Sequence, residues 1–461
     1  MATDKDLMLS LLDKIYAVVV GTDDINGIDA NRGAIASFTL PGIPIEKEDL
    51  DFSFIDLAKM DVAADFSSLV NSVPPNSGRW QPSNRKVESY YSRVLNESIR
   101  PVVELSDDEK KRLLVAQQSL TRLVDAIDLT TGGTKQVPAD TPLYEAYQDR
   151  QQDYLNALMS YKSLQADFLQ RPTDLSAQAK WFSQGPVLKK QVEAKYKRWI
   201  AGGKIQIEAA INTIEELGRG TGERWSHMLE MLRAGVQQTS EGQEFYFTKY
   251  FPSAFWDEAH ASSWTKFSMS HEELHTVDES STTNYGGGGG TSFGMWSLSA
   301  SASYAEQKQH FKSDGQLSTF DVELIRVPIR RSWWDPTVFW DRGWKFDPQI
   351  SNLVLSEGTM PPKGEMGMYP TALIVARNLK VGIDLTSEEN SHVATQMSAS
   401  GSVGWGPFSV KGNYSRSTDR KTHDFVRTAA GIECAGMQII GFVCEPLPKS
   451  PNPDLTLNWK A

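Results

Sequence analysis

A stretch of strictly alternating side chains follows a run of glycine in the second half of the chain. Five consecutive glycines occupy positions 286–290, and every second residue from Ser297 to Ser303 is serine. The residues that flank and separate these serines are apolar: Trp296, Leu298, Ala300, Ala302 and Tyr304. Because successive side chains of a β-strand point to opposite faces, this pattern predicts a strand with one hydroxyl face and one apolar face. Such a strand fits a sheet that separates core from water, or lipid from water.

A second segment has a similar order of features. In the first unit, about 260–335, an acidic Ser/Thr-rich strand leads through the alternating strand and a charged stretch to an apolar strand at 320–329. The second unit, about 375–446, ends in an apolar strand at 437–444. Its glycine-turned hairpin contributes these pairing or membrane-facing residues: Met397, Val403, Trp405, Phe408, Val410 and Tyr414. The spacing differs between the two units, so the sequence predicts a divergent duplication.

Composition changes along the chain in a way that predicts an α+β fold. Residues 1–100 are mixed, and we expect an amphipathic helix near residues 4–19. Residues 101–240 have helical patterns, whereas residues 241–461 are rich in Ser, Thr, Gly and aromatic residues. Helices followed by strands, without alternation, predict a helical bundle with long antiparallel helices. They also predict a C-terminal antiparallel β-rich domain with two similar hairpin units.

The helical part contains clear start signals. Ser106 and Glu109 have the spacing of a capping box, in which each side chain accepts a hydrogen bond from a free amide at the helix start. Threonine followed by proline at 141–142 predicts a second start. We also expect the apolar stripe of the first helix to continue as far as Val124.

An aromatic residue recurs every seven positions from Tyr147 to Phe168. This stripe predicts a long helix that packs on another helix, either within the chain or between copies of it. A further helix is expected over 187–217, with a kink at Gly202-Gly203.

A tryptophan-rich stretch follows the apolar strand of the first unit. We assign its residues as candidate interface groups: Arg330, Arg331, Trp333, Trp334, Trp340 and Trp344. Arginine binds over indole rings, and tryptophan is favoured at membrane interfaces, protein interfaces and sugar faces. The alternative is a loop folded over the end of the sheet, with its indoles in the core.

The sequence also contains a formal zinc-peptidase motif. His271 and His275 enclose Glu272 in the pattern H-E-x-x-H, which on a helix places both imidazoles on one face. The flanking residues predict a strand, and the corresponding part of the second unit lacks the motif. The G-x-S-x-G match at 290–294 has no buried strand before it and no helix after it. We therefore expect no catalytic residue, cofactor or metal, and keep His271 and His275 as the ligands of a zinc-hydrolase alternative.

Charge and hydropathy narrow the choice of partners. The formal net charge of −11 argues against nucleic acid. No apolar run reaches the roughly eighteen residues of a membrane-spanning helix. The N-terminus lacks the basic start of a signal peptide, which predicts synthesis in the cytoplasm, with later release as the route to a target membrane. Cys434 and Cys444 are too few for a disulfide framework; they are either two buried thiols or one pair across a hairpin.

The sequence as a whole predicts a non-enzymatic, self-associating protein that binds membranes or forms pores through amphipathic β-hairpins, as soluble toxins and defence proteins do. Strands of about 9–11 residues cross a bilayer when they close into a barrel. We expect other copies of the chain and a lipid membrane as partners. The alternatives are a cytoplasmic self-assembling scaffold that uses the same strands for edge pairing, and the zinc-dependent hydrolase.

Overall fold

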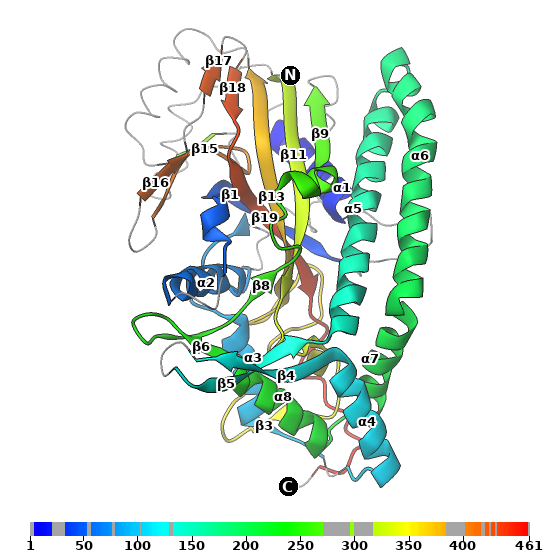
Figure 1. The fold of residues 1–461 in the computed structure, drawn as a ribbon, viewed down its shortest axis with the longest axis vertical. Coiled ribbons are helices and arrows are strands. Elements are labelled where there is room, and N and C mark those ends of the chain that lie inside the picture. Colours follow the sequence, from blue (N-terminus) through cyan, green and yellow to red (C-terminus); the bar gives the residue numbers. More distant parts are fainter. Residues whose placement is uncertain are drawn as a thin grey trace.

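The chain folds around a central, mostly antiparallel sheet with helices on its flanks, which confirms the predicted α+β class (Figure 1). The computed structural model describes residues 4–20, 33–52, 57–75, 79–101, 103–128, 132–270, 296–298, 317–383, 402–415, 420–423, 426–428 and 431–459.

The central sheet is built mainly from the second half of the sequence. Its path runs β9 (Thr265–Ser270), β11 (Leu317–Arg330), β13 (Met368–Ile383), β19 (Met437–Pro446), β1 (Ile35–Ile45) and β2 (Arg79–Trp80). The apolar strands predicted at 320–329 and 437–444 are confirmed within β11 and β19. Beyond the end of β19, the long strand β13 pairs with β18 (Gly431–Cys434), which in turn pairs with β17 (Val426–Thr428).

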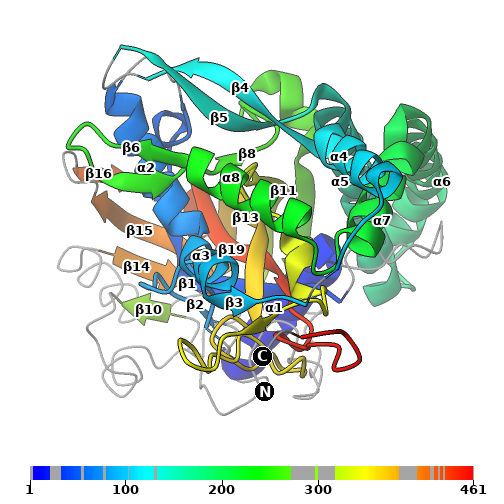
Figure 2. The same ribbon diagram turned by 90° about the horizontal axis from the view of Figure 1, so that it is seen from below.

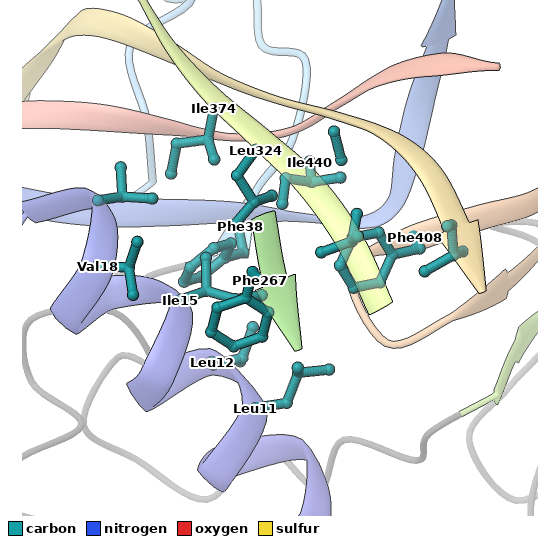
Figure 3. Packing of buried hydrophobic residues seen from close by; sticks show 14 of the residues in the cluster. Leu11, Leu12, Ile15, Val18, Phe38, Phe267, Leu324, Ile374, Phe408 and Ile440 are labelled. Atoms are coloured by element: carbon teal, nitrogen blue, oxygen red, sulfur yellow. The ribbon is translucent and has the colours of Figure 1, made fainter. Parts of the chain in front are cut away.

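Both faces of this sheet are buried. On one face the predicted N-terminal helix, confirmed as α1 (Asp4–Val20), packs Leu12 and Ile15 against Leu324 and its neighbours (Figure 3). On the other face Ile325, the next residue of β11, packs with a second apolar cluster that includes Phe66 of α2 (Leu57–Val70). Burial of successive residues on opposite faces explains why β19 is a nearly continuous apolar run.

The first hundred residues belong to this same core. β1 lies beside β19 with Ile35 opposite Cys444, a contact between residues at opposite ends of the chain. A further apolar cluster joins α3 (Val87–Glu97) to α8 (Gly222–Ala234). The division of the sequence into residues 1–100, 101–240 and 241–461 stays a prediction. The apolar clusters of the described residues contain side chains from all three parts.

The helical part begins as predicted and then departs from the prediction. The Ser106 capping box starts α4 (Asp107–Leu120), and Thr141 caps α5 (Pro142–Gln170). The expected continuation of the apolar stripe to Val124 is wrong, because α4 ends at Leu120. Val124 lies in β4 (Thr121–Ile127), which forms a hairpin with β5 (Thr134–Asp140), and β-branched residues in this stretch favour a strand.

Helix α5 pairs with α6 (Leu175–Trp199) to form a long arm beside the sheet (Figures 1 and 2). The helix predicted from residue 187 begins earlier, at Leu175, because Asp174 caps its start. Pro186 lies within this helix and does not begin it. Gly202 and Gly203 break the regular helix at the turn Ile200–Lys204, as expected, before α7 (Ile205–Leu217).

The aromatic stripe of α5 is buried within the arm. Tyr154 is fully buried and stacks on Trp199 of α6, with ring centroids 5.6 Å apart. Phe168 stacks on Trp181 at 5.4 Å. The stripe is therefore an intramolecular helix contact, the first of the two predicted alternatives.

The remaining elements are short. They are η1 (Lys47–Asp49), β3 (Ser98–Ile99), β6 (Val236–Gln238), β7 (Glu244–Tyr246), β8 (Lys249–Tyr250), η3 (Glu258–Ser263), η6 (Pro336–Phe339) and β12 (Lys345–Phe346).

Candidate functional site

The alternating strand of the first unit pairs with the hairpin of the second unit. A small sheet has the order β10 (Trp296–Leu298), β14 (Ser402–Trp405), β15 (Phe408–Ser415) and β16 (Arg420–His423). Within it, Trp296 lies opposite Trp405, and Leu298 lies opposite Val403. The structure thus pairs part of the alternating strand of the first unit with part of the hairpin of the second unit.

Several predicted hairpin residues fall outside this description. Ala300, Ala302, Tyr304 and Met397 lie outside the described residues. Tyr414 is in β15, where its backbone pairs with Lys421 of β16.

The small sheet is attached to the main body through its apolar face. Trp405, Phe408 and Val410 are at most 2% exposed and belong to the core beneath α1. Phe320 of β11 lies between the two sheets, 5.5 Å from the Trp405 ring and 5.3 Å from the Phe408 ring. In this fold these side chains contact protein, so contact with lipid requires the small sheet to move away from α1.

A glutamine side chain fastens β15 to the central sheet. The Oε1 atom of Gln438 accepts a hydrogen bond from the Ser409 amide at 2.5 Å, and its Nε2 donates to the Ser409 carbonyl at 3.1 Å. Gln438 therefore binds both polar groups of one residue, as a neighbouring strand would. It reaches β15 through a register shift in β1, where Gly42 is needed because a Cβ atom would collide with Oε1 of Gln438.

The two units leave the central sheet at the same end. At this end Ser270, the last residue of β9, lies opposite Thr319 of β11. The first residue of β11, Leu317, lies opposite Ile383, the last residue of β13. The chain returns to β13 through β18, where Ile432 lies opposite Val381. Each unit therefore departs from and returns to neighbouring strands at one edge of the fold.

Most of the tryptophan-rich stretch is inside the protein. Trp333 and Trp344 are 1% and 0% exposed, and their indole nitrogens donate to backbone carbonyls of Phe247 and Val338. The alternative of a folded loop with its indoles in the core therefore describes these two residues. Trp334 is half-buried, whereas Trp340 is 39% exposed. The role of Trp340 at an interface stays a prediction.

The two candidate arginines are also buried, and they bind protein groups. Arg330 pairs with Asp149 of α5 at 2.6 Å and lies over the ring of Phe251, where the sequence suggested an indole partner. Arg331 donates to the side chain of Asn71 and to the backbone carbonyls of Val70 and Pro370. Burial lowers the pKa of Arg331 to about 10.

Sequence reasoning missed a buried ionic group below this loop. Arg224 of α8 is 1% exposed and binds Asp341 at 3.1 Å and Asp335 at 3.2 Å. Both aspartates lie in the sequence between tryptophans. Two carboxylates within a stretch rich in aromatic residues were the sequence signal that could have indicated a buried ion pair. A buried ion pair of this kind fixes the loop in one position and does not by itself indicate a reaction.

The remaining candidates concern metal binding, the two cysteines and membrane-spanning helices. No group of three or more His, Cys, Asp or Glu side chains in the described part of the chain is placed to hold a metal, and His271 and His275 lie outside it. Cys434 and Cys444 are both buried thiols, and burial raises the pKa of each. Among the described helices, none is long and apolar enough to cross a membrane.

Comparison with protein-family models, curated proteins and solved structures found no match for this chain.

Proposed function

We propose that this protein self-associates and inserts amphipathic β-hairpins into membranes, as pore-forming toxins and defence proteins do. The observation that carries the proposal is the pairing of β10 with β14, which joins the two alternating segments in one small sheet. Each segment combines a polar face with an apolar face, the property that a strand needs at the wall of an aqueous membrane pore.

The strand order supports this use of the two segments. Each segment connects strands that are neighbours in the central sheet: β9 with β11, and β13 with β18. If each segment extended as a hairpin, its two arms would continue hydrogen-bonded pairs that already exist. Every new backbone group except those at the outer edges would then have a partner, and association of copies in a ring would pair the edges.

The apolar face of the small sheet is protected from water in this fold. Trp405, Phe408 and Val410 are buried against α1 and Phe320, so the exposed surface carries little of the apolar area that membrane insertion requires. Insertion therefore includes release of the small sheet from Gln438 and α1. Transfer of these side chains from the protein core to lipid retains their apolar environment.

The proposal is tested by two substitutions of adjacent residues on opposite faces of β10. Leu298→Lys places a charge on the apolar face, where a lysine near the bilayer midplane costs about 2–4 kcal/mol. Ser297→Lys places the same charge on the polar face. We expect wild-type protein and Ser297→Lys to release dye from loaded liposomes, and Leu298→Lys to lose at least about tenfold in the rate of release.

Equal release by the two variants would contradict insertion of this strand. Wild-type protein that neither sediments with liposomes nor releases dye, across lipid compositions and after limited proteolysis, would contradict membrane association altogether. Rings or filaments formed without lipid would then favour the scaffold alternative.

A further inference from the structure

Helix α6 is strongly basic in an acidic protein. It contains six cationic residues and a single acidic residue, Glu193, whereas the whole chain has a net charge of −11. Lys195 pairs with Asp153 of α5 at 2.5 Å. The other five cations are exposed and form no ion pair with any described residue: Lys180, Lys189, Lys190, Lys197 and Arg198.

Most of these cations lie on the face that points away from the protein. The buried positions of α6, Ala177, Gly185, Val192 and Trp199, recur every seven or eight residues and define the face that packs on α5. At about 100° per residue, Lys190 and Lys197 lie opposite this buried face, and Lys180 and Arg198 lie beside them on the outward half of the helix. We call these four residues the basic face; it extends for roughly 27 Å along the helix.

An acidic surface lies on η1, α2 and the β6–β7 hairpin. Its carboxylates, which we call the acidic flank, are Glu48, Asp51, Asp61, Glu241 and Glu244. Two lysines within it, Lys47 and Lys59, pair with Glu48 and Asp51 and leave an excess of negative charge. Asp61 accepts hydrogen bonds from the amide and hydroxyl of Ser240, which joins the β6–β7 hairpin to α2.

The basic face and the acidic flank lie on opposite sides of the molecule. In Figures 1 and 2, α6 forms one lateral margin, and α2 with the β6–β7 hairpin lies at the other. Charges of opposite sign on opposite sides cannot meet within one copy. They complement each other when two copies stand side by side in the same orientation.

We propose that the basic face of α6 binds the acidic flank of a second copy of this chain, in a head-to-tail contact. Such a contact uses two different surfaces, so each added copy leaves one of each surface free. Repetition gives a ring when the rotation closes and a filament when it does not. The inference rests on the self-association in the proposed function and identifies the two surfaces that carry it.

Attraction between the two charged surfaces makes the association of copies depend on salt. Exposed charges are screened within about 10 Å at 0.1 M salt, so association by this contact weakens as salt is added. An apolar contact between edges or cores does not weaken in this way.

Charge reversal on each surface, followed by mixing, tests the contact. One variant carries Lys190→Glu with Lys197→Glu, and the other carries Glu48→Lys with Glu241→Lys. We expect sedimentation velocity at low salt to show concentration-dependent association of wild-type protein, weakened at least about tenfold in each variant alone. In an equal mixture, the intact acidic flank of the first variant meets the intact basic face of the second, so mixed dimers form with wild-type affinity.

A control variant has the same change in charge elsewhere. Lys111→Glu with Lys363→Glu alters two exposed lysines on α4 and on a loop, and we expect wild-type association. A mixture that associates as weakly as the separate variants, or a wild-type protein that is strictly monomeric at low salt, would overturn the proposed contact.

Dye release measured in parallel separates this inference from the proposed function. Release that is equal in wild type and both variants overturns the contact but leaves membrane insertion standing. Restored association in the mixture without any release by wild type overturns membrane insertion but supports the contact.

Discussion

Glu88 shows how a single buried side chain couples this fold to pH. It stands in the first turn of α3, within the electrostatic influence of Lys86 and the buried Arg331, and one of its carboxylate oxygens has no hydrogen-bond partner among the described residues. Burial raises the pKa of Glu88 to about 7, and the neighbouring positive charges offset only part of that effect. The folded protein therefore binds a proton at this residue more tightly than the unfolded chain, whose glutamates have a pKa of about 4.3.

The sign of the pH effect follows from this difference. A raised carboxyl pKa means that the contribution of Glu88 to stability is greatest below about pH 4.3 and is lost as the pH rises to about 7. Glu88→Gln removes the ionisation. We measure the free energy of unfolding of variant and wild type with denaturant at pH 4.5 and at pH 8. We expect the stability of the variant minus that of wild type to be larger at pH 8 than at pH 4.5, by as much as ~3 kcal/mol. A difference between variant and wild type that is equal at the two pH values would contradict this account.

At the scale of elements, the attachment of β15 determines whether the hairpin stays on the body of the protein. Gln438→Leu replaces the amide with an apolar side chain of similar size and leaves the amide and carbonyl of Ser409 without their partner. Unsatisfied buried groups cost about 1–3 kcal/mol each. We expect lower stability and faster amide hydrogen exchange over 402–415, together with faster dye release from liposomes.

A neighbouring buried hydrogen bond provides the matched control. Thr39 of β1 donates to the carbonyl of Ile439, one residue beyond Gln438, so this hydrogen bond joins two strands of the central sheet. Thr39→Val should destabilise the protein without a selective increase in exchange over 402–415. An equal increase in both variants would mean that Gln438 has no special role in holding the hairpin.

Local sequence signals predicted some elements well because the physics behind them is local. The Ser106 capping box and the Thr141 cap satisfy amide groups within one turn, so the start of each helix is fixed by neighbouring residues. The helix–strand switch at Thr121 was missed, because β4 is stabilised by pairing with β5 further along the chain. Leu120 and Val124 are both apolar, so hydrophobicity alone does not mark this boundary.

At the scale of the whole molecule, long-range pairing determined what the sequence could not predict. The alternation at Trp296–Leu298 and the hairpin turn before Phe408 were visible, but their pairing joins segments more than a hundred residues apart. The union of β1 with β19, and the approach of Gln438 to Ser409, depend in the same way on contacts between distant parts. The location of the tryptophan-rich stretch could not be predicted from its composition. An indole ring fits an interface, but it fits the core equally well when its N–H donates to a backbone carbonyl, as in Trp333 and Trp344.

The central claim is that the alternating strand meets lipid on one face and water on the other, and a fluorescence scan in liposomes tests it most directly. Single cysteines replace each residue from Trp296 to Tyr304 in turn and carry an environment-sensitive dye; the native Cys434 and Cys444 are buried and shielded from labelling in the folded protein.

In the presence of liposomes, we predict bright, blue-shifted emission at Trp296, Leu298, Ala300, Ala302 and Tyr304, with water-like emission at the serines between them. The same emission at both sets of positions, in protein that is bound to the liposomes, would contradict the account.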